Sequence, residues 1–216
     1  MTLVIYVETG VGGHTDDATQ AWSFALEHWG RCGQGHDEPS ALLALAGSLG
    51  LAPADFEVVE RIQGDEGAFA RDHQPASAGE RAATRTILEQ ARAATIDLLT
   101  QATPAQLDWD DPQRVLPSWA CWRTLRQMGW HLTRTESRYY LAALGVQAPP
   151  VAGDLIEELH RSHEHVLTTL EELPPALATE VKGQRWTTTK VLRRLAWHER
   201  AELEVMRELL ANAPPR

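Results

Sequence analysis

Four long segments in the last two thirds of the chain carry apolar residues at helical spacing. The first covers 78–101, and the second covers 119–144 and ends at Gly145. The third runs from Asp154 to Leu173, just before two prolines, and the fourth from Thr187 to about Leu210. Helices of this length with one apolar face each predict an all-α four-helix bundle over 78–212.

The first third of the chain instead predicts short strands and one helix. Segment 2–8 (TLVIYVE) is rich in β-branched residues, 22–27 is a plausible second strand, and 56–62 (FEVVERI) alternates as a third. Between them, Asp37 suits the N-cap of a helix over 40–49 that Gly50 ends. We therefore expect a small β-β-α-β domain over 1–66, a polar linker over 67–77, and an α+β fold overall.

An internal repeat relates the second and fourth predicted helices. Segment 119–131 (WACWRTLRQMGWH) recurs 67 residues later as 186–198 (WTTTKVLRRLAWH), with Trp, Leu, Arg, Trp and His in common. The apolar spacing around each final Trp-His pair is helical. Two different helices are thus expected to present His131 and His198 at equivalent depth.

The stripe on the fourth helix also carries a carboxylate. Glu202 follows His198 by four residues, which is about one turn, so both side chains can reach one ion. In the first copy of the repeat, Thr135 holds the equivalent place on a buried stripe that includes Tyr139. The predicted ligands are His131, His198 and Glu202, with one coordination position open. A histidine on an apolar stripe is also commonly a core residue held by a hydrogen bond, and the spacing alone leaves both interpretations open.

The segments WRTLRQMGWHLTRTESRYYLAAL and WTTTKVLRRLAWHERAELEVM resemble the second and fourth helices of the DinB superfamily of bacterial four-helix metalloproteins. That family takes one His from its second helix and a His-x-x-x-His pair from its fourth. The chain departs from this pattern at the last ligand, where it has Glu202. The resemblance implies a divalent metal ion, with zinc favoured and nickel, iron or manganese left open.

The same resemblance implies thiol chemistry on a small-molecule substrate. Family members of known activity transfer a low-molecular-weight bacterial thiol to an electrophile, or catalyse a thiol-dependent isomerisation. The metal would bind the sulfur and favour the reactive thiolate. The alternative is a non-catalytic metal-binding stress-response or partner-binding protein. Bundles of this kind often pair, so a homodimer is also left open.

Several other polar residues lie near the expected site. His163 falls in line with the apolar residues of the third helix and could be a fourth ligand or a hydrogen-bond partner of a ligand. Arg134, Arg138 and Arg194 lie within two turns of the histidines and could hold an anionic substrate. For each of these residues, the commoner role is structural. Trp130 and Trp197 are expected at the flanks of their helices, against a neighbouring helix, the first domain or a second subunit.

Charge and composition limit the partners. Of the net charge of −10, residues 1–74 contribute twelve acidic against three basic residues, which we interpret mainly as a solvated face. Such a balance argues against nucleic acid and anionic membranes. No long apolar run or basic leader is present, so a cytoplasmic protein is expected. Cys32 and Cys121 are too few for a disulfide framework.

The turn into the first helix has a resemblance of its own. The segment 30–45 (GRCGQGHDEPSALLAL) is similar to the small HicB-like domain, in which a Gly-Cys segment leads to a capped turn and an Ala-Leu helix. Domains of that type occur as antitoxins and as accessory modules. The chain shows no DNA-binding tail, so the accessory role is expected here.

Overall fold

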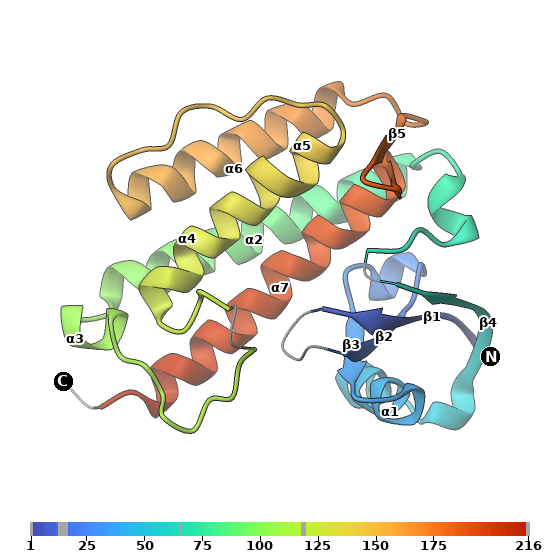
Figure 1. Ribbon diagram of the computed structural model, residues 1–216, viewed down its shortest axis with the longest axis horizontal. Coiled ribbons are helices and arrows are strands. Elements are labelled where there is room, and N and C mark those ends of the chain that lie inside the picture. Colours follow the sequence, from blue (N-terminus) through green and yellow to red (C-terminus); the bar gives the residue numbers. More distant parts are fainter. Residues whose placement is uncertain (1, 13–16, 65, 118–119, 215–216) are drawn as a thin grey trace.

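The protein has an α+β fold in which an N-terminal sheet packs against a mostly helical remainder (Figure 1). The structure, a computed structural model, describes residues 2–12, 17–64, 66–117 and 120–214. Within these residues, no helix is both long and apolar enough to cross a membrane.

The N-terminal sheet has the strand order β3-β2-β1-β4. Its strands are β1 (Leu3–Val11), β2 (Ala18–Trp22), β3 (Cys32–Gly35) and β4 (Phe56–Gln63). Neighbouring strands pair antiparallel except β1 and β4, which are parallel. Helix α1 (Glu38–Leu49) lies between β3 and β4 in the chain. As predicted, Asp37 caps α1 and Gly50 ends it at a φ of 67°. The apolar face of α1 packs on the sheet through Ala41 and Leu45.

The predicted β-β-α-β order is wrong by one strand. The second strand lies at Ala18–Trp22, and Leu26–His28 form a 3-10 turn, whereas 22–27 had been expected to be extended. The segment expected to be a turn contains β3, whose glycines lie directly beneath α1. A Cβ on Gly33 would come within 2.1 Å of the carbonyl oxygen of Ala41, so this strand requires glycine for close approach.

Four longer helical segments make up most of the rest of the described chain. Helix α2 covers Ala78–Gln101, α6 covers Leu155–Glu172 and α7 covers Thr188–Asn212. Their N-caps are Ser77, Asp154 and Thr187, so the predicted starts are confirmed. The remaining segment joins α4 (Leu125–Thr135), a π-helical turn (Glu136–Tyr140) and α5 (Leu141–Ala143). The apolar faces of all four segments meet in two clusters of buried residues, centred on Leu88, Val166, Leu192 and Leu195 and on Leu99, Met128, Leu159 and Met206.

The second helical segment departs from prediction at its start and in its middle. Thr124 caps α4, six residues later than expected, and Trp119 of the repeat lies outside the described residues. The π-helical turn inserts an extra residue per turn, which rotates the side chains that follow it. As a result Tyr140 is buried, with 3% of its surface exposed, while Tyr139, which was expected in the buried stripe, is 45% exposed.

Two shorter elements were not predicted. The chain forms a one-turn helix, α3 (Pro104–Leu107), after α2. A two-stranded hairpin of β5 (Ala178–Val181) and β6 (Gln184–Thr187) precedes α7. The hairpin turn places Lys182 and Gly183 at positive φ. Residues of this hairpin border a cavity.

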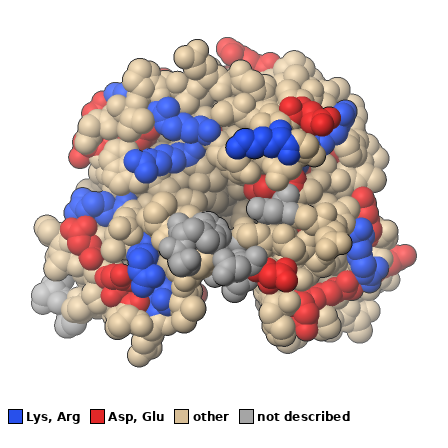
Figure 2. All heavy atoms as spheres, in the orientation of Figure 1, with Lys and Arg blue, Asp and Glu red and all other residues tan. Residues whose placement is uncertain are grey.

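The N-terminal part and α7 share a buried set of charges, which we call the interface cluster. Asp72 pairs with Arg193 at 2.8 Å and Glu8 with Arg194 at 2.7 Å. Glu66 lies 3.2 Å from Arg194, and its carbonyl oxygen accepts from Lys190. The acidic excess of residues 1–74 is thus only partly a solvated face, although acidic side chains also gather over the outer surface of this part (Figure 2).

The segment expected to be a linker, 67–77, is packed rather than extended into solvent. Phe69 and Asp72 are fully buried around a 3-10 turn, Ala70–His73. Thr187 and Thr189 of the α7 start donate hydrogen bonds to the carbonyl oxygens of Asp72 and Gln74. The N-terminal part is therefore held against α7 by its connection as well as by its sheet.

Candidate metal centre

Helices α4 and α7 bring together the three residues that the repeat singled out. The Nε2 atoms of His131 and His198 lie 3.2 Å apart. Oε1 of Glu202 lies 3.8 Å from each of them. These are the described His, Cys, Asp and Glu residues that lie close enough in a group to hold one metal ion.

The separations fit a metal-sized gap between the three atoms. A triangle with these edges has a common point about 2.1 Å from each corner, which is within the range of Zn–N and Zn–O bonds. The donor set of two imidazoles and one carboxylate suits zinc or ferrous iron. The second oxygen of Glu202, Oε2, is buried and has no hydrogen-bond partner among the described residues. The residues present therefore fit a divalent cation.

Glu136 holds the far side of the His198 ring. Its Oε1 lies 3.4 Å from Nδ1 of His198. An ionised carboxylate can only accept, so this contact favours the proton on Nδ1 and leaves the lone pair of Nε2 facing His131 and Glu202. Glu136 is the first residue of the π-helical turn and is fully buried. The other carboxylate oxygen of Glu136, Oε2, pairs with Arg92 at 2.7 Å.

Arg92 of α2 is a central residue that the sequence analysis missed. Its buried guanidinium donates to Oε2 of Glu136 at 2.7 Å and to Oε1 of Glu199 at 3.0 Å. It also donates to the carbonyl oxygen of Leu159 and to Oγ of Ser162. The signal was present, because 92 continues the spacing of the buried positions 88, 95 and 99 on the apolar face of α2.

Burial disfavours the ionised form of three carboxyl groups in and next to the candidate site. Burial raises the pKa of Glu202 to about 7, an effect that Arg114 opposes and the nearby Glu136 reinforces. Burial also raises the pKa values of Glu136 and Glu199, and Arg92 lowers both only in part. We call Arg92, Glu136, Glu199 and Glu202, with the two histidines, the site cluster.

His131 lies on the more accessible side of the centre. Its side chain is 18% exposed, against 4% for His198. The ring stacks on Trp122 with centroids 4.2 Å apart, and Oγ1 of Thr135 lies 3.4 Å from Nδ1. Thr135, which replaces a carboxylate in this copy of the repeat, thus lies against the ring edge that faces away from the other ligand atoms.

A pocket of about 260 Å³ opens beside the two histidines. The helical part contributes His131, His198, Tyr140 and Trp197 to its lining, among others. The N-terminal part contributes Val11, Gly12, Gln20 and Glu66. Trp197 packs edge-on against Trp22 of β2, which confirms its expected place at a helix flank. The metal-sized gap is therefore served by a pocket that both parts of the chain enclose.

The remaining predicted site residues lie farther from the ligand atoms. His163 on α6 is outside the grouped ligands, and its partial burial lowers its pKa to about 4. Arg194 borders the pocket but is paired with Glu8 and Glu66. Arg134 is exposed and lies over the ring of Trp130, whereas Arg138 lines a neighbouring cavity. Ligand or anion binding by these four residues stays a prediction.

In a comparison with known families, residues 87–206 match the model of the DinB superfamily. This segment covers more than half of the chain and contains His131, His198 and Glu202. The chain belongs to the DinB superfamily. No curated protein and no solved structure matched it. The DinB match begins within α2, so it includes Arg92 and Glu136 and leaves out the N-terminal sheet.

Proposed function

We propose that this DinB-superfamily protein binds one divalent metal ion through His131, His198 and Glu202, within a bundle of its four long helical segments. We further propose that it uses the ion in thiol-dependent transfer or isomerisation of small electrophiles, with a low-molecular-weight thiol as co-substrate. The observation that carries the proposal is the convergence of three ligand atoms at 3.2 to 3.8 Å beside a pocket.

Charge balance in the site cluster supports a cation at this point. The site cluster holds three buried carboxylates, of which Glu136 and Glu199 pair with the buried guanidinium of Arg92. The third, that of Glu202, has a raised pKa although the partly buried Arg114 opposes this effect. Buried charges without counter-charges are costly, so the excess of buried carboxylates over buried guanidinium groups favours either protonation or a divalent cation.

In this proposal the metal supplies a Lewis acid that favours the thiolate form of a bound thiol. The chain's own residues hold and orient the two ligand histidines. Glu136 keeps the proton of His198 on Nδ1, and Trp122 covers one face of the His131 ring. The ring of Tyr140 packs edge-on against that of His198, with the ring centroids 5.8 Å apart. In the transfer, the thiol releases its proton to solvent, sulfur bonds to the electrophilic carbon, and the leaving group departs with its electron pair.

The alternative is a non-catalytic protein in which the same site binds metal for stability or partner recognition. The N-terminal part supports this alternative, because Gln20 and Glu66 enclose one side of the pocket. A HicB-like accessory role for residues 1–66 belongs to this proposal, supported by the capped turn and Ala-Leu helix after the Gly-Cys segment. A homodimer and a cytoplasmic location stay predictions.

Metal analysis of protein purified without a polyhistidine tag tests the metal site. We expect about one equivalent of metal per chain in the wild type and in His163→Ala, and almost none in His198→Ala. At free metal of about 100 times the dissociation constant, binding adds about 2.7 kcal/mol to the free energy of unfolding, which His198→Ala should lose. Unchanged metal content in His198→Ala would remove that residue from the ligand set.

A screen of the metal-loaded protein with several low-molecular-weight thiols and halogenated or epoxide electrophiles tests the reaction. Turnover that EDTA removes and metal restores supports the enzyme. Full metal loading without turnover for any pair supports the non-catalytic alternative.

A further inference from the structure

A second cavity of about 360 Å³ lies beside the metal-site pocket, between the π-helical turn and the β5–β6 hairpin. Tyr139 lines both cavities, so the two spaces adjoin at this partly exposed side chain. We propose that this second cavity binds the carboxylate end of an elongated ligand whose thiol end occupies the metal-site pocket. This inference rests on the proposed function and specifies the class of thiol that the site accepts.

The π-helical turn distributes its side chains between the two spaces. Glu136 contacts His198, and Tyr140 packs against the same ring from the metal-site pocket. Arg138 lines the second cavity, and Tyr139 lies between the two. A regular α-helix would rotate these positions differently, and π-helical turns frequently occur at functional sites. The turn therefore joins the ligand-holding residues to the second cavity.

The charge of the second cavity selects an anion. Its charged lining residues are Arg138 and Lys182, and its described lining contains no carboxylate. Arg138 is only partly used by the protein: it donates to the carbonyl oxygen of Pro149 and lies 3.8 Å from Glu158, and its side chain is 30% exposed. A guanidinium and an ammonium group facing one space recognise a carboxylate.

The non-polar part of the cavity suits the chain that would link the two ends of such a ligand. Trp186 of β6 lines the cavity together with Ala142 and Ala143. The rings of Tyr139 and Trp186 meet edge-on at 5.5 Å. Methylene groups passing Tyr139 would therefore contact aromatic and small apolar side chains before the anionic end reaches Arg138.

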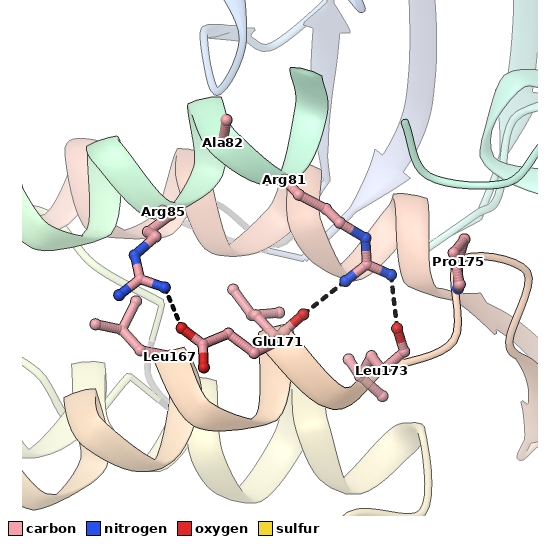
Figure 3. A pocket seen from close by; sticks show the side chains of 8 residues that line it. Arg81, Ala82, Arg85, Leu167, Glu171, Leu173 and Pro175 are labelled. Atoms are coloured by element: carbon pink, nitrogen blue, oxygen red, sulfur yellow. Dashed lines mark hydrogen bonds and ion pairs between the residues drawn. The ribbon is translucent and has the colours of Figure 1, made fainter. Parts of the chain in front are cut away.

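A groove of about 350 Å³ between α2 and α6 contains two arginines whose hydrogen-bonding groups are used by the protein itself (Figure 3). There Arg81 donates to the carbonyl oxygens of Leu170 and Leu173, at the end of α6. Arg85 pairs with Glu171, which itself lines the groove (Figure 3). The protein uses these two arginines for its own structure. The cavity at Arg138 differs because no acidic residue lines it.

Calorimetric titration with matched thiols tests the proposal. The probes are 3-mercaptopropionate and 6-mercaptohexanoate, each compared with the alcohol of the same length, on zinc-loaded protein and again in EDTA. We expect the wild type to bind at least one carboxylate about tenfold more tightly than its alcohol. Arg138→Met should remove most of this preference, and Lys182→Asn, which suits the positive φ of that position, should reduce it. Arg138→Lys should retain part of it.

Arg126→Met serves as the matched control, because Arg126 lies on α4, pairs with Asp108 at the surface and lines neither cavity. It should keep the full preference. An equal affinity for carboxylate and alcohol, no binding of either, or a preference that Arg138→Met and Lys182→Asn leave intact would overturn the proposal. A carboxylate preference that is the same with zinc and with EDTA would retain the subsite but contradict the metal function, so the two failures are distinguishable.

Discussion

Helix α7 carries two sets of buried charges, and the difference between them concerns balance. In the interface cluster, Arg193 and Arg194 pair with Asp72, Glu8 and Glu66, and Lys190 donates to the carbonyl oxygen of Glu66. In the site cluster, two turns farther along, Glu136 and Glu199 share the guanidinium of Arg92, while the third buried carboxylate, that of Glu202, lies against the two histidines. Both sets are desolvated to a similar degree. The charges of the interface cluster are matched within the protein, whereas the excess of carboxylates in the site cluster must be balanced by protons or by a cation.

Buried charges thus serve two purposes on α7. Ion pairs that are matched within the protein fix how two parts of the chain dock, and Gly30 adds to this by allowing close approach at Ala196, where a Cβ would come within 2.9 Å. Carboxylates in excess are unfavourable in the absence of a ligand. Their cost is recovered on metal binding, so the excess is a feature of a binding site rather than of a structural core.

The largest expected effect tests the interface cluster. Arg193 lies over the rings of Trp22, Phe24 and Phe69 and pairs with Asp72. Arg193→Met leaves Asp72 as an uncompensated buried charge and should lower the free energy of unfolding by about 3–5 kcal/mol. Urea unfolding should show the same loss with zinc and with EDTA.

The control for this prediction is Arg207→Met on the exposed side of α7, which should change the free energy of unfolding by less than about 0.5 kcal/mol. A loss in Arg193→Met that depended on zinc would mean that the two clusters are coupled, and the comparison would fail.

The next effect concerns the site cluster and pH. In metal-free folded protein the pKa of Glu202 is raised from 4.5 to about 7. Between these pH values the folded protein keeps a proton that the unfolded chain has lost, so the free energy of unfolding falls as pH rises from about 4.5 to about 7. Glu202→Gln removes this cost and should stabilise the metal-free protein by about 3 kcal/mol at pH 8, with no gain at pH 4. With zinc the order should reverse, because the variant lacks a ligand.

Urea unfolding at both pH values, in EDTA and in zinc, measures this prediction. Glu208→Gln, an exposed position on the same helix, should behave as the wild type under all four conditions. If metal-free Glu202→Gln were no more stable than the wild type at pH 8, the carboxylate excess would not be a cost to the protein.

The smallest effect concerns the orientation of His198. Glu136→Gln keeps the shape of the side chain but weakens its acceptance from Nδ1 of His198. Zinc affinity, measured by competition with a chelating dye, should fall about tenfold. Glu157→Gln, exposed on α6, should leave the affinity unchanged. An unchanged affinity in Glu136→Gln would limit Glu136 to its pairing with Arg92.

Much of the helical part could be predicted because its signals are local. Apolar spacing and caps such as Asp154 and Thr187 gave the starts of the helices, and their turn-to-turn geometry placed Glu202 near His198. The strand β3 was missed because its glycines serve a close contact with α1, which in sequence looks the same as a turn. The π-helical turn was missed for a similar reason, since its sequence fits a regular helix and only packing selects the extra residue.

The sequence by itself determined that two helices each present an imidazole, and that a carboxylate lies one turn from His198, because these relations repeat with the period of the helix. Only the tertiary structure decided that His131 meets His198, that Arg92 joins Glu136 across 44 residues of chain, and that the acids of the N-terminal part neutralise α7. Those contacts depend on how separate elements pack, and the spacing of residues along the chain carries no record of which buried charge will face which.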